Sequence, residues 1–267
     1  MNRISKLLVI CCAAVLVSGC GDGEPEQTRE DIIKRKELIK QVNASGKITD
    51  KQAEFLGSVK GMPSFNGFTL SALSLNGLTF ITDAPMKKLD NIVMLSLDGL
   101  TSITDAQAES LGKVSGLFLN GLTSLTDQQA KSLSKVEISI YLDGLTSITD
   151  AQAESLSKVG SLRLNGLTSI NDIQIEILSK VESLVLHGLT SITDVQAESL
   201  SKVSDTLFLN GLTSITDAQA ESLSKVKSVR LVSLTSITEP QAKSLSKVEF
   251  LRVSKDLQPL IDKYKKQ

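Results

Sequence analysis

The sequence predicts a curved α/β solenoid in which short parallel strands alternate with short helices. Three observations predict it. A Gly-Leu-Thr step recurs every 22 or 23 residues between Gly77 and Gly211. Each copy joins an alternating apolar stretch to a helical pattern, and a fixed period of this length is typical of stacked repeats that share one core. Aromatic residues make up only 3% of the chain and tryptophan is absent, so that core must be aliphatic.

The strand of each repeat is indicated by two leucines that alternate with polar residues. In residues 161–165, Leu162 and Leu164 lie on one side of an extended chain and Ser161, Arg163 and Asn165 on the other. Gly166 then ends the strand. We therefore expect one short strand per repeat, with one face in the core.

The helix of each repeat starts with a capping signal. In residues 149–159, Thr149 and Gln152 have the spacing of a capping box, and Asp150 adds negative charge at the helix N-terminus. Apolar side chains then recur at every third position. The predicted core of this part of the array is Leu145, Ile148, Ala153, Leu156, Val159, Leu162 and Leu164.

Stacking such units makes the array curve. Paired strands lie about 4.8 Å apart, whereas packed helices need roughly 8–10 Å between their axes. The strand side must therefore be the shorter side. We expect a parallel sheet on the concave face and short helices on the convex face.

The repeat pattern LxLxxLxxITDxxAxxLxxV resembles the leucine-rich repeat over residues 48–253. It is most similar to the cysteine-containing subtype, although Leu167 and Leu189 stand where that subtype has cysteine and the unit is shorter. The resemblance implies the leucine-rich-repeat solenoid fold. Because such proteins mostly bind other proteins on the inner face, it also implies a protein or peptide ligand there.

The N-terminus has the pattern of an export signal. Arg3 and Lys6 precede an apolar run over residues 7–17, which small residues and Cys20 follow. The stretch before Cys20 resembles a bacterial lipobox, which implies cleavage before Cys20 and a lipid anchor on it, at the bacterial cell envelope. Gly21 after the cysteine favours the outer membrane. The alternative is an ordinary signal peptide whose cleavage site lies near a cysteine.

The chain is therefore expected to have four parts. They are a removed lipoprotein signal peptide at 1–19, a polar tether with a charged helix at 20–47, the leucine-rich-repeat solenoid at 48–253 and a C-terminal cap at 254–267. The remaining cysteines, Cys11 and Cys12, lie in the signal, so no disulfide is expected in the mature chain.

The sequence offers no catalytic site, cofactor site or metal site that we would predict. A net charge of −1 gives no basic patch for nucleic acid. Ser-x-x-Lys, as in Ser155 and Lys158, recurs in six copies, which indicates a solvated helix face rather than one desolvated nucleophile. A column of aspartates, among them Asp150, has one carboxylate per repeat and favours helix starts over calcium sites. Threonine columns, among them Thr101 and Thr104, lack the flat spacing of an ice-binding array.

One position of the strand varies from repeat to repeat. The predicted ligand-binding residues there are Phe118, Tyr141, Arg163, Val185, Phe208, Arg230 and Arg252, with His187 from the neighbouring Asn/Asp-rich column. Three of the nine aromatic residues fall in this position, and aromatic and arginine side chains dominate protein-binding hot spots. The alternative is drift among strand-forming residues after duplication.

The function that these observations favour is a non-enzymatic, lipid-anchored recognition scaffold that binds a protein or peptide on its concave face. Two alternatives remain open at this stage. One is a structural or adhesive surface spacer without a specific ligand. The other is a glycan-binding module that uses the aromatic and Asn/Asp columns.

Overall fold

The structure is a computed structural model that describes residues 26–58 and 72–265, with side chains from residue 30 onward. The predicted signal at residues 1–19 and the predicted lipidation site Cys20 lie outside the described residues. Within the described residues, no helix combines the length and the apolar character that crossing a membrane requires.

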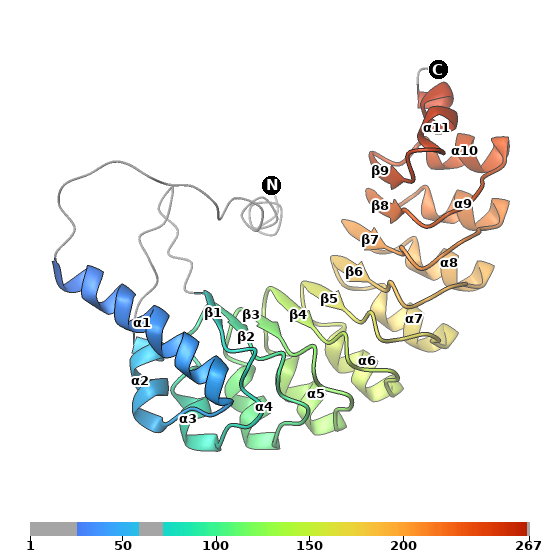
Figure 1. Cartoon of the computed structure of the whole chain (residues 1–267). Helices are drawn as coiled ribbons and strands as arrows, with labels where there is room; N and C mark the ends of the chain where they lie inside the picture. The colour runs from blue at the N-terminus through green and yellow to red at the C-terminus, as the bar shows by residue number, and fades with distance from the viewer. Residues whose placement is uncertain (1–25, 59–71, 266–267) are drawn as a thin grey trace.

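The chain forms a curved array in which the strands line the inner side of the arc and the helices line the outer side (Figure 1). In the described part, the strands make one parallel sheet whose spatial order follows the sequence. They are β1 (Ala72–Ser74), β2 (Met94–Ser96), β3 (Gly116–Phe118), β4 (Ser139–Tyr141), β5 (Ser161–Arg163), β6 (Ser183–Val185), β7 (Thr206–Phe208), β8 (Ser228–Leu231) and β9 (Phe250–Val253).

A short helix follows each of the strands β2 to β8 in turn. These helices are α4 (Asp105–Leu111), α5 (Asp127–Leu133), α6 (Asp150–Leu156), α7 (Asp172–Leu178), α8 (Asp194–Leu200), α9 (Asp217–Leu223) and α10 (Glu239–Leu245). The N-terminal end carries α1 (Glu26–Ser45), α2 (Asp50–Ser58) and α3 (Asp83–Lys87), and the C-terminal end carries α11 (Gln258–Lys265). The predicted leucine-rich-repeat solenoid is thereby confirmed.

The core is one continuous aliphatic column. The middle residue of each strand pairs in register with the middle residue of the next, as Ile140 pairs with Leu162 and Leu162 with Leu184. All seven predicted core residues between Leu145 and Leu164 are buried. Burial of such side chains is worth about 1.5–3 kcal/mol each, and stacked repeats gain it only from their neighbours.

The predicted capping boxes are present, and they also join successive repeats. Thr149 Oγ1 accepts a hydrogen bond from the Gln152 backbone N–H at 3.1 Å, and Gln152 Oε1 accepts one from the Thr149 backbone N–H at 3.0 Å. Gln152 Nε2 then donates to the Leu125 carbonyl of the preceding repeat at 2.7 Å. The glutamines that do the same are Gln107, Gln129, Gln174, Gln196, Gln219 and Gln241.

The recurring glycine marks the place where successive turns approach most closely. A Cβ atom at Gly144 would collide with the backbone carbonyl oxygens of Leu122 and Asn120. Close packing of the turns thus leaves no room for a Cβ atom at Gly144, which is a reason for the Gly-Leu-Thr period. Ser233 takes this position in the repeat next to the last strand.

Helices cover both ends of the array. At the N-terminal end, α1 buries Val42 and closes at Gly46, whose φ of 67° is the left-handed conformation common after helices. Arg35 Nη2 of α1 donates to the Ala72 carbonyl of β1 at 3.1 Å. At the other end, Ile261 of α11 is buried, and Leu257, Leu260 and Tyr264 pack against the core. The last open layers of the core are thereby covered.

Candidate functional site

The variable position of the repeats forms a single row across the concave face. We call this row the variable column; its members are Phe118, Tyr141, Arg163, Val185, Phe208, Arg230 and Arg252, preceded by Ser74 and Ser96. Parallel pairing places each member directly beside the next. The flanking strand residues point into the core, so alternation directs the column toward the concave side. The predicted residues therefore lie together on one surface.

The first cluster in this column is a stack on strands β3 to β5. The rings of Phe118 and Tyr141 have centroids 4.2 Å apart and planes inclined by 13°. The Arg163 guanidinium lies over the Tyr141 ring at 5.6 Å from its centroid. Arg163 also forms a bidentate ion pair with Asp143, with Nη2–Oδ2 at 2.6 Å and Nε–Oδ1 at 3.0 Å. This cluster thus offers a flat, partly apolar surface whose cation is neutralised.

The second cluster lies on strands β7 and β8 and on the turn after β6. The rings of His187 and Phe208 are nearly parallel, at 9°, with centroids 6.3 Å apart. The Arg230 guanidinium lies over the Phe208 ring at 4.2 Å from its centroid. Half-buried Val185, between Arg163 and Phe208 in the register, separates the two clusters.

The neighbouring Asn/Asp-rich column is used by the framework. Asn165 Oδ1 accepts a hydrogen bond from the His187 backbone N–H, one repeat ahead, at 3.0 Å. The same contact occurs along the array, with the acceptors Asn76, Asp98, Asn120, Asp143 and Asn210. We call this series the asparagine ladder. These oxygens thus hold the turn that follows the strand of the next repeat.

His187 is the member of this ladder that differs in chemistry. Its Nδ1 accepts a hydrogen bond from the Asn210 backbone N–H at 3.2 Å, as an asparagine oxygen does in the other repeats. This bond requires an unprotonated Nδ1. Burial and, after it, the nearby Arg163 charge lower the pKa of His187 and so favour the neutral ring. His187 therefore acts first as a strand connector and second as a ring stacked on Phe208.

In the Ser-x-x-Lys pair of Ser110 and Lys113, the hydroxyl and the amine have different partners. The Ser110 hydroxyl donates to the Ala106 carbonyl at 3.1 Å, and the Lys113 amine pairs with Asp90 at 3.0 Å. Each group thus has a partner other than the expected one. No base is placed to activate the hydroxyl in this pair.

The aspartate column at the helix starts also serves the framework. Thr149 Oγ1 donates to Asp127 Oδ1 of the preceding repeat at 2.8 Å. The carboxylates in the same role are Asp83, Asp105, Asp150, Asp194 and Asp217. In the described part of the chain, no three His, Cys, Asp or Glu side chains converge as metal ligands would.

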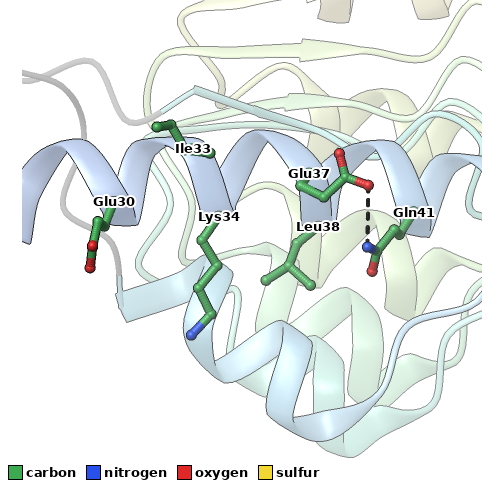
Figure 2. A pocket seen from close by; sticks show the side chains of 6 residues that line it. All are labelled: Glu30, Ile33, Lys34, Glu37, Leu38 and Gln41. Carbon is green, nitrogen blue, oxygen red and sulfur yellow. Dashed lines mark hydrogen bonds between the residues drawn. The ribbon is translucent and has the colours of Figure 1, made fainter.

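A shallow depression lies beside α1, and the described residues that line it all belong to this helix. Figure 2 shows the side chains that line it, which are Glu30, Ile33, Lys34, Glu37, Leu38 and Gln41. Glu37 Oε1 accepts a hydrogen bond from Gln41 Nε2 at 3.3 Å, one helical turn away. These groups follow a single helix and do not converge on a ligand position, so they do not define a binding site.

The structure adds two residues that the sequence prediction did not include. Phe250 is 57% exposed and Val232 is 37% exposed. Each lies two residues from an arginine of the variable column, on the same side of its strand as Arg252 and Arg230 respectively. The alternation of the strand could have indicated both residues, because side chains two positions apart in a strand face the same side.

Comparison with known proteins supports the fold and nothing finer. No protein-family model matches the sequence, and no curated protein matches it. The solved structure of internalin C2 from Listeria monocytogenes aligns with a TM-score of 0.50 at 19% identity, over 82% of this chain and 91% of the internalin.

Two further Listeria monocytogenes structures align less well. An internalin, InlF, has a TM-score of 0.49 at 17% identity, over 84% of this chain and 68% of its own. The functional domain of InlJ, which includes a cysteine ladder, has a TM-score of 0.40 at 12% identity, over 76% of this chain and 50% of its own. The alignment with internalin C2 accords with the leucine-rich-repeat fold of the strands and helices described above.

Proposed function

We propose that this chain is a non-enzymatic recognition scaffold that binds a protein or peptide on its concave face. The observation that carries the proposal is the pair of aromatic stacks, Phe118 with Tyr141 and His187 with Phe208, each next to an arginine. These rings lie outside the aliphatic core, which is complete without them. Aromatic and arginine side chains on a rigid surface are the residues that contribute most to protein interfaces.

The hydrogen bonds between repeats support the proposal, because they separate residues that hold the fold from residues available to a ligand. Carboxylates at the helix starts and oxygens of the asparagine ladder are occupied by neighbouring repeats. The variable column is the part of the concave face whose side chains differ most from repeat to repeat. Specificity therefore resides in residues that the fold does not need, while the repeated residues keep the surface rigid.

For location, we propose an anchor at Cys20 in the bacterial cell envelope, with the outer membrane favoured by Gly21. The sequence around Cys20 supports this proposal, since a basic start, an apolar run and small residues precede the cysteine. One acyl chain alone binds a membrane only marginally, so stable anchoring needs the two or more chains of a bacterial lipoprotein.

Affinity capture tests the proposed function. The fragment 21–267, which contains every described residue, is incubated with envelope extract, and the retained proteins are identified by mass spectrometry. A variant with Phe118→Ser, Tyr141→Ser and Phe208→Ser should fold, by circular dichroism, and should lose the retained partner. The control carries Ile173→Ser and Val195→Ser, which remove exposed apolar side chains from α7 and α8 on the helix side. Equal capture by all three proteins would refute the proposal.

A further inference from the structure

The two arginines at the C-terminal end of the variable column differ from the one in the middle. Arg230 and Arg252 pair in register on β8 and β9. Arg163 is neutralised by Asp143, whereas neither Arg230 nor Arg252 forms an ion pair with a carboxylate of the described residues. In the described residues, the C-terminal end of the concave face therefore carries two arginines without a carboxylate at ion-pair distance.

The positive charge at Arg230 is also short of a hydrogen-bond acceptor. Its Nε is buried and has no hydrogen-bond partner. The guanidinium is held over the Phe208 ring, and Arg252 is its register partner on the adjacent strand, whose backbone lies about 4.8 Å away. Burial and, after it, the Arg252 charge lower the pKa of Arg230, so both disfavour its charged form. A ligand carboxylate placed between the two guanidinium groups would offset the repulsion between them.

Apolar side chains lie in the same part of the concave face. Phe208 lies on one side of Arg230, Phe250 is exposed two residues before Arg252, and Val232 is exposed two residues after Arg230. Arginine recognises carboxylates by paired N–H donors, and exposed apolar groups next to it favour a ligand that carries apolar groups close to its charge. A polypeptide with acidic and apolar residues side by side has this chemistry, whereas a purely polar polyanion does not.

We propose that Arg230, Arg252, Phe250 and Val232 form the docking site for an acidic segment of the protein partner. A carboxylate binds between the two guanidinium groups, and a neighbouring apolar side chain of the partner packs on Phe250. This inference rests on the proposed function and names the chemistry of its ligand. The Phe118–Tyr141 stack lies four strands from Arg230, about 19 Å along the sheet, so an extended segment would span both with roughly six residues.

Selection from a random 12-residue peptide display library tests the inference with the full chain purified in detergent. The wild-type chain should enrich peptides with Asp or Glu next to an apolar residue. The double variant Arg230→Gln, Arg252→Gln should lose the acidic preference, and its affinity for the enriched peptides should fall about tenfold or more. The control Lys158→Gln, Lys180→Gln removes the same charge from exposed lysines outside the concave face and should keep both.

Two results would overturn the inference. One is selection without acidic enrichment, including enrichment of nothing or binding of anionic vesicles alone. The other is the same acidic enrichment by the double variant. If the double variant lacks a folded circular dichroism spectrum, the single variant Arg252→Gln, at an exposed position, takes its place. Loss of the acidic preference in selection, together with capture from envelope extract that depends on Phe118 and Tyr141, supports both proposals. If the double arginine variant keeps the acidic preference while the Phe118, Tyr141 and Phe208 variant loses capture, this inference alone is refuted.

Discussion

Asn165 Oδ1 accepts a hydrogen bond from the His187 backbone N–H at 3.0 Å, so a side chain at the end of one strand holds the start of the turn in the next repeat. The substitution Asn165→Ala leaves that N–H without its partner. We expect it to lower the free energy of unfolding by about 1–3 kcal/mol, measured by urea denaturation. Thr168→Ala, at an exposed position of the same repeat, should change it by no more than about 0.5 kcal/mol. Equal effects of the two substitutions would mean that the ladder does not stabilise the array.

Gln152 should contribute more to the free energy of unfolding than a helix cap alone would. Gln152→Ala removes the acceptor for the Thr149 N–H and the donor to the Leu125 carbonyl at once. We expect a loss of about 1–3 kcal/mol in the free energy of unfolding. The matched control is Gln128→Ala, in the first turn of α5, where the side chain is exposed. If both variants melt at the same temperature, the contact between repeats is energetically neutral.

The stability of the fold should depend on pH through His187. Its pKa is lowered in the folded state by burial and by Arg163, so the unfolded chain takes up the proton first as the pH falls. The contribution of the neutral ring is thus complete above the usual value of about 6.5 and is lost as the pH falls toward the lower folded pKa. Below both values the loss is constant.

The substitution His187→Asn isolates this effect, because asparagine occupies the same ladder position in other repeats. The wild type should lose stability relative to His187→Asn between neutral and mildly acidic pH, measured by urea unfolding at each pH. If the difference in the free energy of unfolding between the wild type and His187→Asn does not change across this pH range, the Nδ1 contact with Asn210 is not coupled to protonation.

Membrane attachment should depend on a single sulfur. With Cys20→Ser, we expect the protein to move from the detergent phase to the aqueous phase in detergent-phase partitioning of whole cells, because no acyl chain can be attached. Cys11→Ser, inside the same predicted signal, should leave the protein in the detergent phase. Unchanged partitioning of the Cys20→Ser protein would contradict the lipid-anchor proposal.

Much of the fold was predictable because each repeat contains the local sequence signals of its own strand and helix. The spacing of Thr149 and Gln152 predicted the capping box, and the alternation of Leu162 and Leu164 predicted the buried face of β5. Repetition then fixed the stacking. The second bond of Gln152, to the Leu125 carbonyl, depends on the position of one repeat relative to the preceding one. The sequence of a single repeat does not determine that relative position.

The candidate site was predictable in its position and less so in its chemistry. Alternation placed Phe118, Tyr141 and Arg230 on one face, and the register agrees. The role of His187 was not predictable, because the contact of Nδ1 with the Asn210 N–H depends on the direction of the ring between two strands. An exposed aromatic ring at Phe250 was not predictable from the repeat pattern, because the preceding repeats have Ser or Thr at this position, from Ser139 to Ser228.

The central claim is that the concave face makes the contact with a partner while the helix side does not, and site-specific photocrosslinking in cells tests it most directly. A photoreactive residue is placed at Val185, between the two aromatic clusters, or at Val195, which is exposed on α8. We predict a discrete crosslinked partner from position 185 and none from position 195. A partner captured equally from both positions, only from position 195, or from neither would contradict the account.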